Sequence, residues 1–208
     1  MKRVMFIIGL CIAITSLAQA DLIGRYIFSN NSNLDGNDPA ANANDDNAID
    51  PSKTALLPGQ TTTLTNYTTY DKGINGIMFD INSLLGAPTA SDFQFLVGNN
   101  NNLSSWTTAP ALSSVNFRSI GSGMDRVTLI WSDNAIQNQW LQITVLPNIN
   151  TGLSLADVFY FGNDIANDSI GLNMITAPVT PVVPVPGAVL LGMLGMGVAG
   201  LKLRKYTK

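Results

Sequence analysis

The sequence predicts an all-β fold: a single antiparallel β-sandwich or jelly-roll-like domain placed between two terminal segments of a different kind. Three observations lead to this expectation. Short segments with alternating apolar residues recur between residues 21 and 177. Clusters of Asn, Gly, Pro and Ser, which favour turns, separate these segments. None of the segments has the periodicity of a long amphipathic helix.

The clearest predicted strands are Arg126–Trp131 and Trp140–Leu146, which are rich in β-branched and aromatic residues. Six further segments with the same character are predicted as strands: Ile23–Phe28, Gln60–Tyr67, Ile74–Ile81, Phe93–Val97, Val115–Arg118 and Val158–Phe161. We also expect one helical turn in each of the linkers Asp133–Gln139 and Ser154–Asp157. About eight short strands without a long helix are typical of a sandwich.

Residues 1–20 are predicted to be a signal peptide. Lys2 and Arg3 precede an apolar run from Val4 to Leu17, and the small-x-small sequence Ala18-Gln19-Ala20 follows it. The apolar run is shorter than the ~20 residues that a membrane-spanning helix needs. We therefore expect cleavage after Ala20, which leaves residues 21–177 as the extracellular domain.

The composition changes after Ala177. Residues 178–186 contain four prolines and predict an extended, stiff spacer. Residues 187–208 begin with an uncharged apolar run that ends at Leu201, and they predict a short transmembrane helix with a basic tail. The positive-inside rule places the basic tail in the cytoplasm and the 21–177 domain outside.

This C-terminal end resembles the PEP-CTERM class of bacterial sorting signals. The resemblance rests on the motif Pro184-Val185-Pro186, the apolar helix and the basic stop formed by Lys202, Arg204 and Lys205. It implies processing by signal peptidase and by an exosortase-like membrane enzyme, followed by delivery to the cell envelope, the cell surface or an exopolysaccharide matrix. Val185 stands where Glu is usual. The alternative interpretation is a plain membrane anchor.

Four stretches of the middle, Gly73–Met78, Asp125–Trp131, Trp140–Val145 and Asp157–Asn163, resemble an uncharacterised extracellular domain of large surface proteins. In those proteins the domain often precedes a dockerin-like segment, whereas here the proline spacer follows. The resemblance implies a β-sandwich displayed outside the cell and no particular activity.

Charge and missing residue types exclude several functions. Residues 21–177 hold all fourteen Asp but only five basic residues, which gives a formal charge of 5 − 14 = −9. Such a surface repels phosphate, so nucleic acid is not an expected partner. The chain has no His and no Glu, and its one Cys, Cys11, lies in the signal peptide. A catalytic triad with a His base, a thiol nucleophile and a His/Cys zinc site are therefore excluded from the mature domain.

The segment Asn30–Asp50 is dense in oxygen ligands of the kind that calcium prefers. The candidate metal residues are Asp35, Asn37, Asp38, Asp45, Asp46 and Asp50. An EF-hand loop that starts at Asp35 fails, because Ala40 stands where Gly is required and Asp46 where Glu is required. The alternatives are an irregular calcium loop and a solvated polar loop.

Three aromatic residues, Trp106, Tyr67 and Tyr70, are the candidate ligand-binding residues. Exposed together on one face, they would stack on sugar rings, and Trp106 is the better candidate for exposure because it lies in a loop, between Ser105 and Thr107. The alternative is packing in the core, where aromatic side chains are most often found.

The leading hypothesis is a non-enzymatic protein of the cell envelope or extracellular matrix. A second hypothesis is a calcium-dependent carbohydrate-binding module. A third is a glycosidase that uses two Asp carboxylates about 5–9.5 Å apart in a cleft. The enzyme is the least favoured, because the side chains that most often act as bases are missing.

Overall fold

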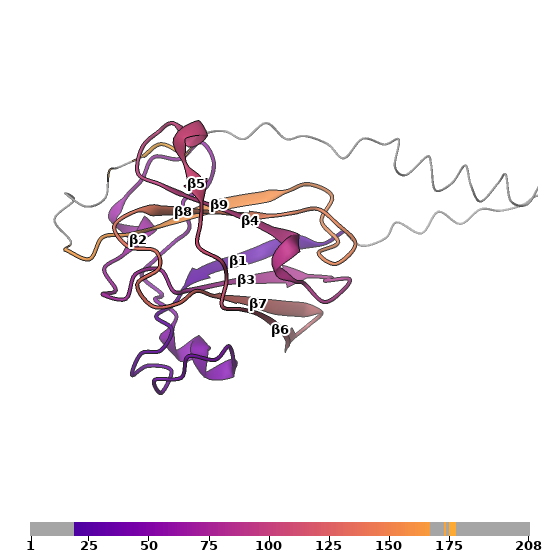
Figure 1. Cartoon of the computed structure of the whole chain (residues 1–208). Coiled ribbons are helices and arrows are strands. Elements are labelled where there is room, and N and C mark those ends of the chain that lie inside the picture. The colour runs from indigo at the N-terminus through magenta and orange to yellow at the C-terminus, as the bar shows by residue number, and fades with distance from the viewer. Residues whose placement is uncertain (1–18, 167–172, 174, 178–208) are drawn as a thin grey trace, which may run out of the picture.

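The computed structural model describes residues 19–166, 173 and 175–177, which form two packed β-sheets (Figure 1). The four-stranded sheet has the order β1-β3-β7-β6 and consists of β1 (Asp21–Ile27), β3 (Gly76–Asn82), β7 (Met124–Ile130) and β6 (Ser114–Gly121). The five-stranded sheet has the order β2-β9-β8-β4-β5 and consists of β2 (Tyr67–Thr68), β9 (Asp157–Asn163), β8 (Trp140–Val145), β4 (Phe93–Gly98) and β5 (Thr107–Thr108). Short 3₁₀ helices are η1 (Ala43–Ala48), η2 (Leu64–Asn66), η3 (Ala90–Asp92) and η4 (Leu103–Ser105).

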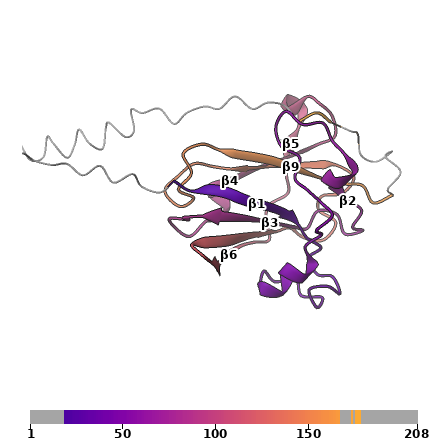
Figure 2. The same ribbon diagram turned by 180° about the vertical axis from the view of Figure 1, so that it is seen from behind.

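The two-sheet arrangement confirms the predicted all-β sandwich. Its strand pairs are antiparallel with one exception, since β2 runs parallel to β9 through the pairs Tyr67–Gly162 and Thr68–Asn163. Figure 2, seen from behind, shows the same two layers. The predicted signal peptide and C-terminal helix fall outside the described residues, apart from Gln19 and Ala20.

The core lies between the two sheets and follows the period of two. On β3, Ile77, Phe79 and Ile81 are at most 1% exposed, and on β8 Leu141 and Ile143 are fully buried in the same apolar cluster. Burying one such side chain stabilises the fold by about 1.5–3 kcal/mol relative to leaving it exposed. This alternation explains why the strand predictions from the sequence were close for seven of the eight segments.

Both outer faces of the sandwich are also covered. Met78 and Ile130 lie on the outer face of the four-stranded sheet, where they pack with Phe28 and Ala48. On the outer face of the five-stranded sheet a second cluster consists of Leu56, Tyr67, Trp106, Trp140, Tyr160, Ile175 and Ala177. Central strands therefore bury side chains on both faces, and six of the seven residues of β3 are buried.

Two predictions about local structure are wrong. The segment Gln60–Tyr67 forms a single bridge at Thr61 and then the helix η2, because Asn66 accepts a hydrogen bond from the Thr63 amide at 2.8 Å. Such local bonds compete with a strand ladder. The linkers Asp133–Gln139 and Ser154–Asp157 contain turns and bends but no helix. In the first linker Asn134 and Asn138 have φ angles of 66° and 52°, which a right-handed helix excludes.

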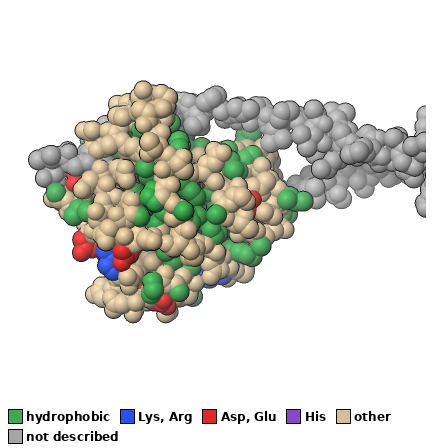
Figure 3. Space-filling model, viewed as in Figure 1, with side chains coloured by type: hydrophobic (Ala, Val, Ile, Leu, Met, Phe, Trp, Pro, Cys, Tyr) green, Lys and Arg blue, Asp and Glu red, His purple; other side chains and the backbone are tan. Residues whose placement is uncertain are grey.

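Figure 3 shows that one face of the domain carries few charged side chains, with apolar groups scattered among polar ones. This agrees with a chain in which only 12% of residues are charged. Within the described residues, no helix has the length and apolar character needed to span a bilayer.

Candidate functional site

The acidic loop, residues 29–50, follows β1 and lies against the outer face of the four-stranded sheet (Figures 1 and 2). Its helix η1 begins after Asn42, whose side chain accepts a hydrogen bond from the Asn44 amide at 2.7 Å. Asp45 completes a capping box by accepting from the Asn42 amide at 2.8 Å. Ala48 then packs against the apolar side chains of the sheet.

Charged side chains of the sheet fix this loop in place. Asp46 forms ion pairs with Arg118 on β6 and, at 2.9 Å, with Arg126 on β7. Arg126 also binds Asp80 on β3. Burial alone would raise the pKa of Asp46, but the two guanidinium groups outweigh it and lower that pKa. Asp46, which the sequence suggested as a metal ligand, is thus committed to two arginines.

The structure brings together only part of the predicted metal set. Asp35 Oδ1 accepts hydrogen bonds from the Ser32 amide at 3.0 Å and from the Asp38 amide at 3.4 Å. Asp38 Oδ2 in turn accepts a hydrogen bond from the Asn42 side chain at 2.8 Å. The backbone amide of Asn42 donates to Asp45 Oδ2, also at 2.8 Å. Asp35, Asp38 and Asp45 therefore lie in one hydrogen-bonded group.

The other predicted ligands lie apart from this group or point to solvent. Asn37 is exposed with a φ of 59°, and Asp50 accepts two hydrogen bonds from Ser52. Across the described parts of the chain, no group of three or more acidic side chains is arranged to hold a metal ion. Of the six metal-binding residues predicted from the sequence, only Asp35, Asp38 and Asp45 thus lie in one hydrogen-bonded group.

Asp45 is the most perturbed carboxyl group of the loop. Its side chain is fully buried, and burial raises its pKa from 3.8 to about 6. The hydrogen bond from Asn42 opposes this shift, while the negative charges of Asp35, Asp38 and Asp46 add to it. A buried carboxyl group among like charges needs either a proton or a cation near neutral pH.

Sequence reasoning overlooked Asn30, the first polar residue of the loop. It is 2% exposed, and its backbone N–H donates to Oδ1 of Asn75 at 3.1 Å. The neighbouring fragment Asn31-x-Asn33-x-Asp35-Gly36 matches the first half of a calcium loop, but it does not include Asn30. Nδ2 of Asn31 donates to Asp133 at 2.9 Å.

Trp106, the better candidate for exposure among the three aromatic residues, is buried. Trp106 is 7% exposed and Tyr67 is 3% exposed, and both belong to the apolar cluster on the outer face of the five-stranded sheet. The indole N–H of Trp106 donates to the Asn100 carbonyl at 2.9 Å, and its ring packs edge-on to Tyr160. The ring fits closely over Gly98, where a Cβ atom would lie 2.3 Å from it.

Tyr70, the third residue of the predicted sugar-binding set, is half-buried. Its hydroxyl donates to the Asn30 carbonyl at 3.0 Å, so it belongs to the base of the acidic loop. Trp106, Tyr67 and Tyr70 therefore do not form an exposed aromatic platform of the kind that stacks on sugar rings.

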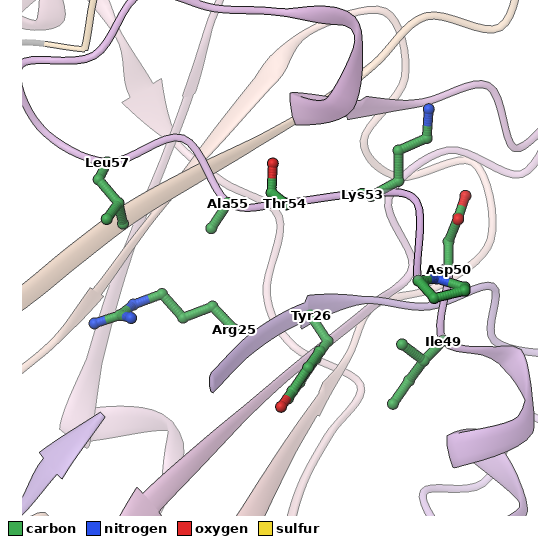
Figure 4. Close-up of a pocket in the computed structure, with 9 residues that line it drawn as sticks. Arg25, Tyr26, Ile49, Asp50, Lys53, Thr54, Ala55 and Leu57 are labelled. Carbon is green, nitrogen blue, oxygen red and sulfur yellow. The ribbon is translucent and has the colours of Figure 1, made fainter. Parts of the chain in front are cut away.

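A cavity of about 420 Å³ lies between β1 and residues 49–57 (Figure 4). Its basic lining residues are already engaged. Arg25 binds Asp157, with Nε 2.9 Å from Oδ1, and the Lys53 ammonium donates to the Leu64 carbonyl at 3.3 Å. Figure 4 shows the Lys53 side chain directed away from Arg25. Asp50 is the one carboxylate among its lining residues, so this cavity does not supply the paired carboxylates of a glycosidase.

Comparison with known proteins gives no match: no family model, no curated protein and no solved structure matches this chain. The predicted sorting motif Pro184-Val185-Pro186 and the predicted basic stop Lys202, Arg204 and Lys205 lie outside the described residues. The acidic loop, with its buried carboxyl groups, is the candidate site for a ligand.

Proposed function

We propose that this protein is a non-enzymatic domain that is exported, sorted by its C-terminal tail and displayed at the cell envelope, the cell surface or in the extracellular matrix. The N-terminal signal pattern, the tail and the charge of −9 in residues 21–177 support this proposal. In it, the tail is the substrate of an exosortase-like enzyme, and exopolysaccharide is a candidate partner of the released domain.

The observation that carries the proposal is the way the folded domain ends. Ile175 and Ala177 are 2% and 1% exposed, and they pack in the same cluster as Trp106 and Tyr160. The Ala177 amide donates to the Gln60 carbonyl at 2.9 Å. The last residues before the proline spacer are therefore buried and paired, which suits a domain that is held by its tail.

Several carboxylates of the domain form ion pairs, which supports a non-enzymatic role. Asp80 binds Arg126, and Asp157 binds Arg25. Asp133 pairs with Lys72 at 3.2 Å. Ion pairs of this kind stabilise the fold. A carboxylate that is paired in this way is not free to act as a base or a nucleophile.

Fractionation of cells that produce the full chain tests the proposal. A host with an exosortase-like enzyme should carry the protein on its surface or in its matrix, and a chain that ends at Ala177 should pass into the medium. Substituting Pro184 and Pro186 by Ala is the matched control, because it keeps the helix and the basic stop. Recovery of the full chain in the cytoplasm, with its signal uncleaved, would contradict the proposal.

A further inference from the structure

Four buried oxygen atoms of the acidic loop have no hydrogen-bond partner within the part of the chain that the structure describes, and one of them, Oδ1 of Asp46, lies in an ion pair with Arg126 at 2.9 Å. The other three are Oδ2 of Asp35, Oδ1 of Asp45 and Oδ1 of Asn30. The side chains that carry them are 2%, 0% and 2% exposed. Buried polar atoms are nearly always paired, and an unpaired carboxylate oxygen is especially costly. The three atoms therefore indicate a missing positively charged partner.

The side chains that carry these atoms belong to one connected set of loop residues. Asp35 binds the amide of Asp38, and Asn42 joins Asp38 to Asp45. Asn30 reaches over the same loop, because its Nδ2 contacts the Pro39 carbonyl at 3.4 Å. The two carboxylates and the Asn30 amide thus belong to one hydrogen-bonded stretch of the loop, between residues 30 and 45.

No basic side chain neutralises this region. Among the described residues, neither Asp35 nor Asp45 takes part in an ion pair. The arginines that reach the loop, Arg118 and Arg126, bind Asp46 and Asp80 instead. The positive partner of Asp35 and Asp45 must therefore come from solution.

We propose that Asp35, Asp45 and Asn30 bind a calcium ion at the base of the acidic loop. The donors are all oxygen atoms, which suit a hard cation, and two carboxylates match its charge. Calcium takes about six to eight oxygen ligands, so backbone carbonyls and water complete the shell. Asp46 and Asp50, which the sequence included in the set, are not ligands in this site.

Calcium at this position joins the start of the loop at Asn30 to the helix η1 that carries Asp45. Because Asp46 next to it already holds Arg118 and Arg126, the ion would complete the attachment of the loop to the sheet. The expected affinity is that of extracellular modules, with a Kd of about 10⁻⁴–10⁻³ M. The inference is independent of the export proposal, since it concerns the domain alone.

Equilibrium dialysis of the purified full chain against ⁴⁵Ca²⁺ measures the site directly. We expect one ion per chain and weaker binding by at least about tenfold in the variants Asp45→Asn and Asp35→Asn. These changes keep the size of the side chain and remove one charge each. Asp50→Asn, in the same segment but paired only with Ser52, is the matched control and should bind like the wild type.

The melting temperature in calcium and in a chelator gives a second reading, because a ligand of the native state stabilises it. Calcium should raise the melting temperature of the wild type and of Asp50→Asn, and should leave that of Asp45→Asn unchanged. The inference is overturned if the wild type binds no calcium at ~10 mM, well above the range for such modules. It is also overturned if folded Asp45→Asn and Asp35→Asn both bind as well as the wild type.

Discussion

Arg126 on β7 lies directly opposite Asp80 on β3 and binds it through two parallel hydrogen bonds, Nε to Oδ1 at 2.7 Å and Nη2 to Oδ2 at 2.8 Å. The side chains are only 13% and 8% exposed. The same guanidinium reaches Asp46 of the acidic loop and lies over the Tyr26 ring. One arginine thus joins two strands of the sheet to the loop that holds the candidate calcium site.

Replacing Arg126 by Met should lower the free energy of unfolding by about 3 kcal/mol, because it leaves the mostly buried Asp80 without its partner. Urea unfolding measures this loss. Arg118→Met is the matched control: the Arg118 side chain is 29% exposed and its ion pair is with Asp46, so its loss should cost no more than about 1 kcal/mol. If both substitutions lowered the free energy of unfolding equally, the Arg126–Asp80 pair would not contribute more to stability than the exposed Arg118–Asp46 pair.

Trp106→Ala should destabilise the domain by about 3–5 kcal/mol, as is usual when a buried aromatic side chain is removed. Urea unfolding of the variant checks this value. Exposed Leu64→Ala is the control, since the side chain of Leu64 is 69% exposed and its removal leaves no cavity. A fully stable Trp106→Ala variant that has lost binding to a polysaccharide would instead favour a ligand-binding tryptophan.

The pH dependence of stability should report the raised pKa of Asp45. Its folded-state pKa of about 6 lies above the ordinary value of 3.8, so its contribution is fully present below pH 3.8 and is lost as the pH rises through 6. In calcium-free buffer, lowering the pH from 7.5 to 5 should therefore stabilise the wild type by about 1.4 kcal/mol, because pH 5 lies about one unit below the folded-state pKa.

Asp45→Asn separates this effect from other titrations. Asp35, Asp38 and Asp46 face Asp45, and Arg118 and Arg126 stand beyond Asp46. The variant should lose most of the stabilisation between pH 7.5 and 5, as measured by thermal unfolding. A wild type that becomes steadily less stable over this range would contradict the assignment.

Ile175→Asp should release the end of the domain from the cluster around Trp140 and Tyr160, because it buries an unpaired charge. Limited proteolysis should then cut the chain near residue 175 faster than in the wild type. Thr176→Asp is the control in the next position, where the side chain is exposed. Equal cleavage of both variants would show that the burial of Ile175 does not hold this end.

The sequence was sufficient to predict strands whose apolar residues face the core. Ile77, Phe79 and Ile81 recur along β3 with a period of two, and hydrophobic burial enforces that period whatever the loops do. The sequence could not show that loops cover both outer faces. Trp106 lies in a loop and was the better candidate for exposure, yet its ring packs over Gly98 and is only 7% exposed.

The composition of the sequence predicted an acidic loop. It did not predict which of its Asp residues pair with arginine and which do not. Asp45 and Asp46 are neighbours with the same chemistry, and only the fold places Arg118 and Arg126 beside Asp46 alone. Asn30 likewise has no distinguishing motif, and its burial depends on Asn75, far along the chain. Such pairings arise from contacts between distant strands, which a local pattern does not encode.

The intact mass of the protein recovered from producing cells is the most direct test of export and sorting. We expect a chain that begins at Asp21 and has lost the residues after about Pro186, in agreement with cleavage of both terminal signals. A mass equal to that of the chain from Asp21 to Lys208, found only in the membrane fraction, would identify a plain anchor and contradict sorting. A mass that includes Met1 would contradict export.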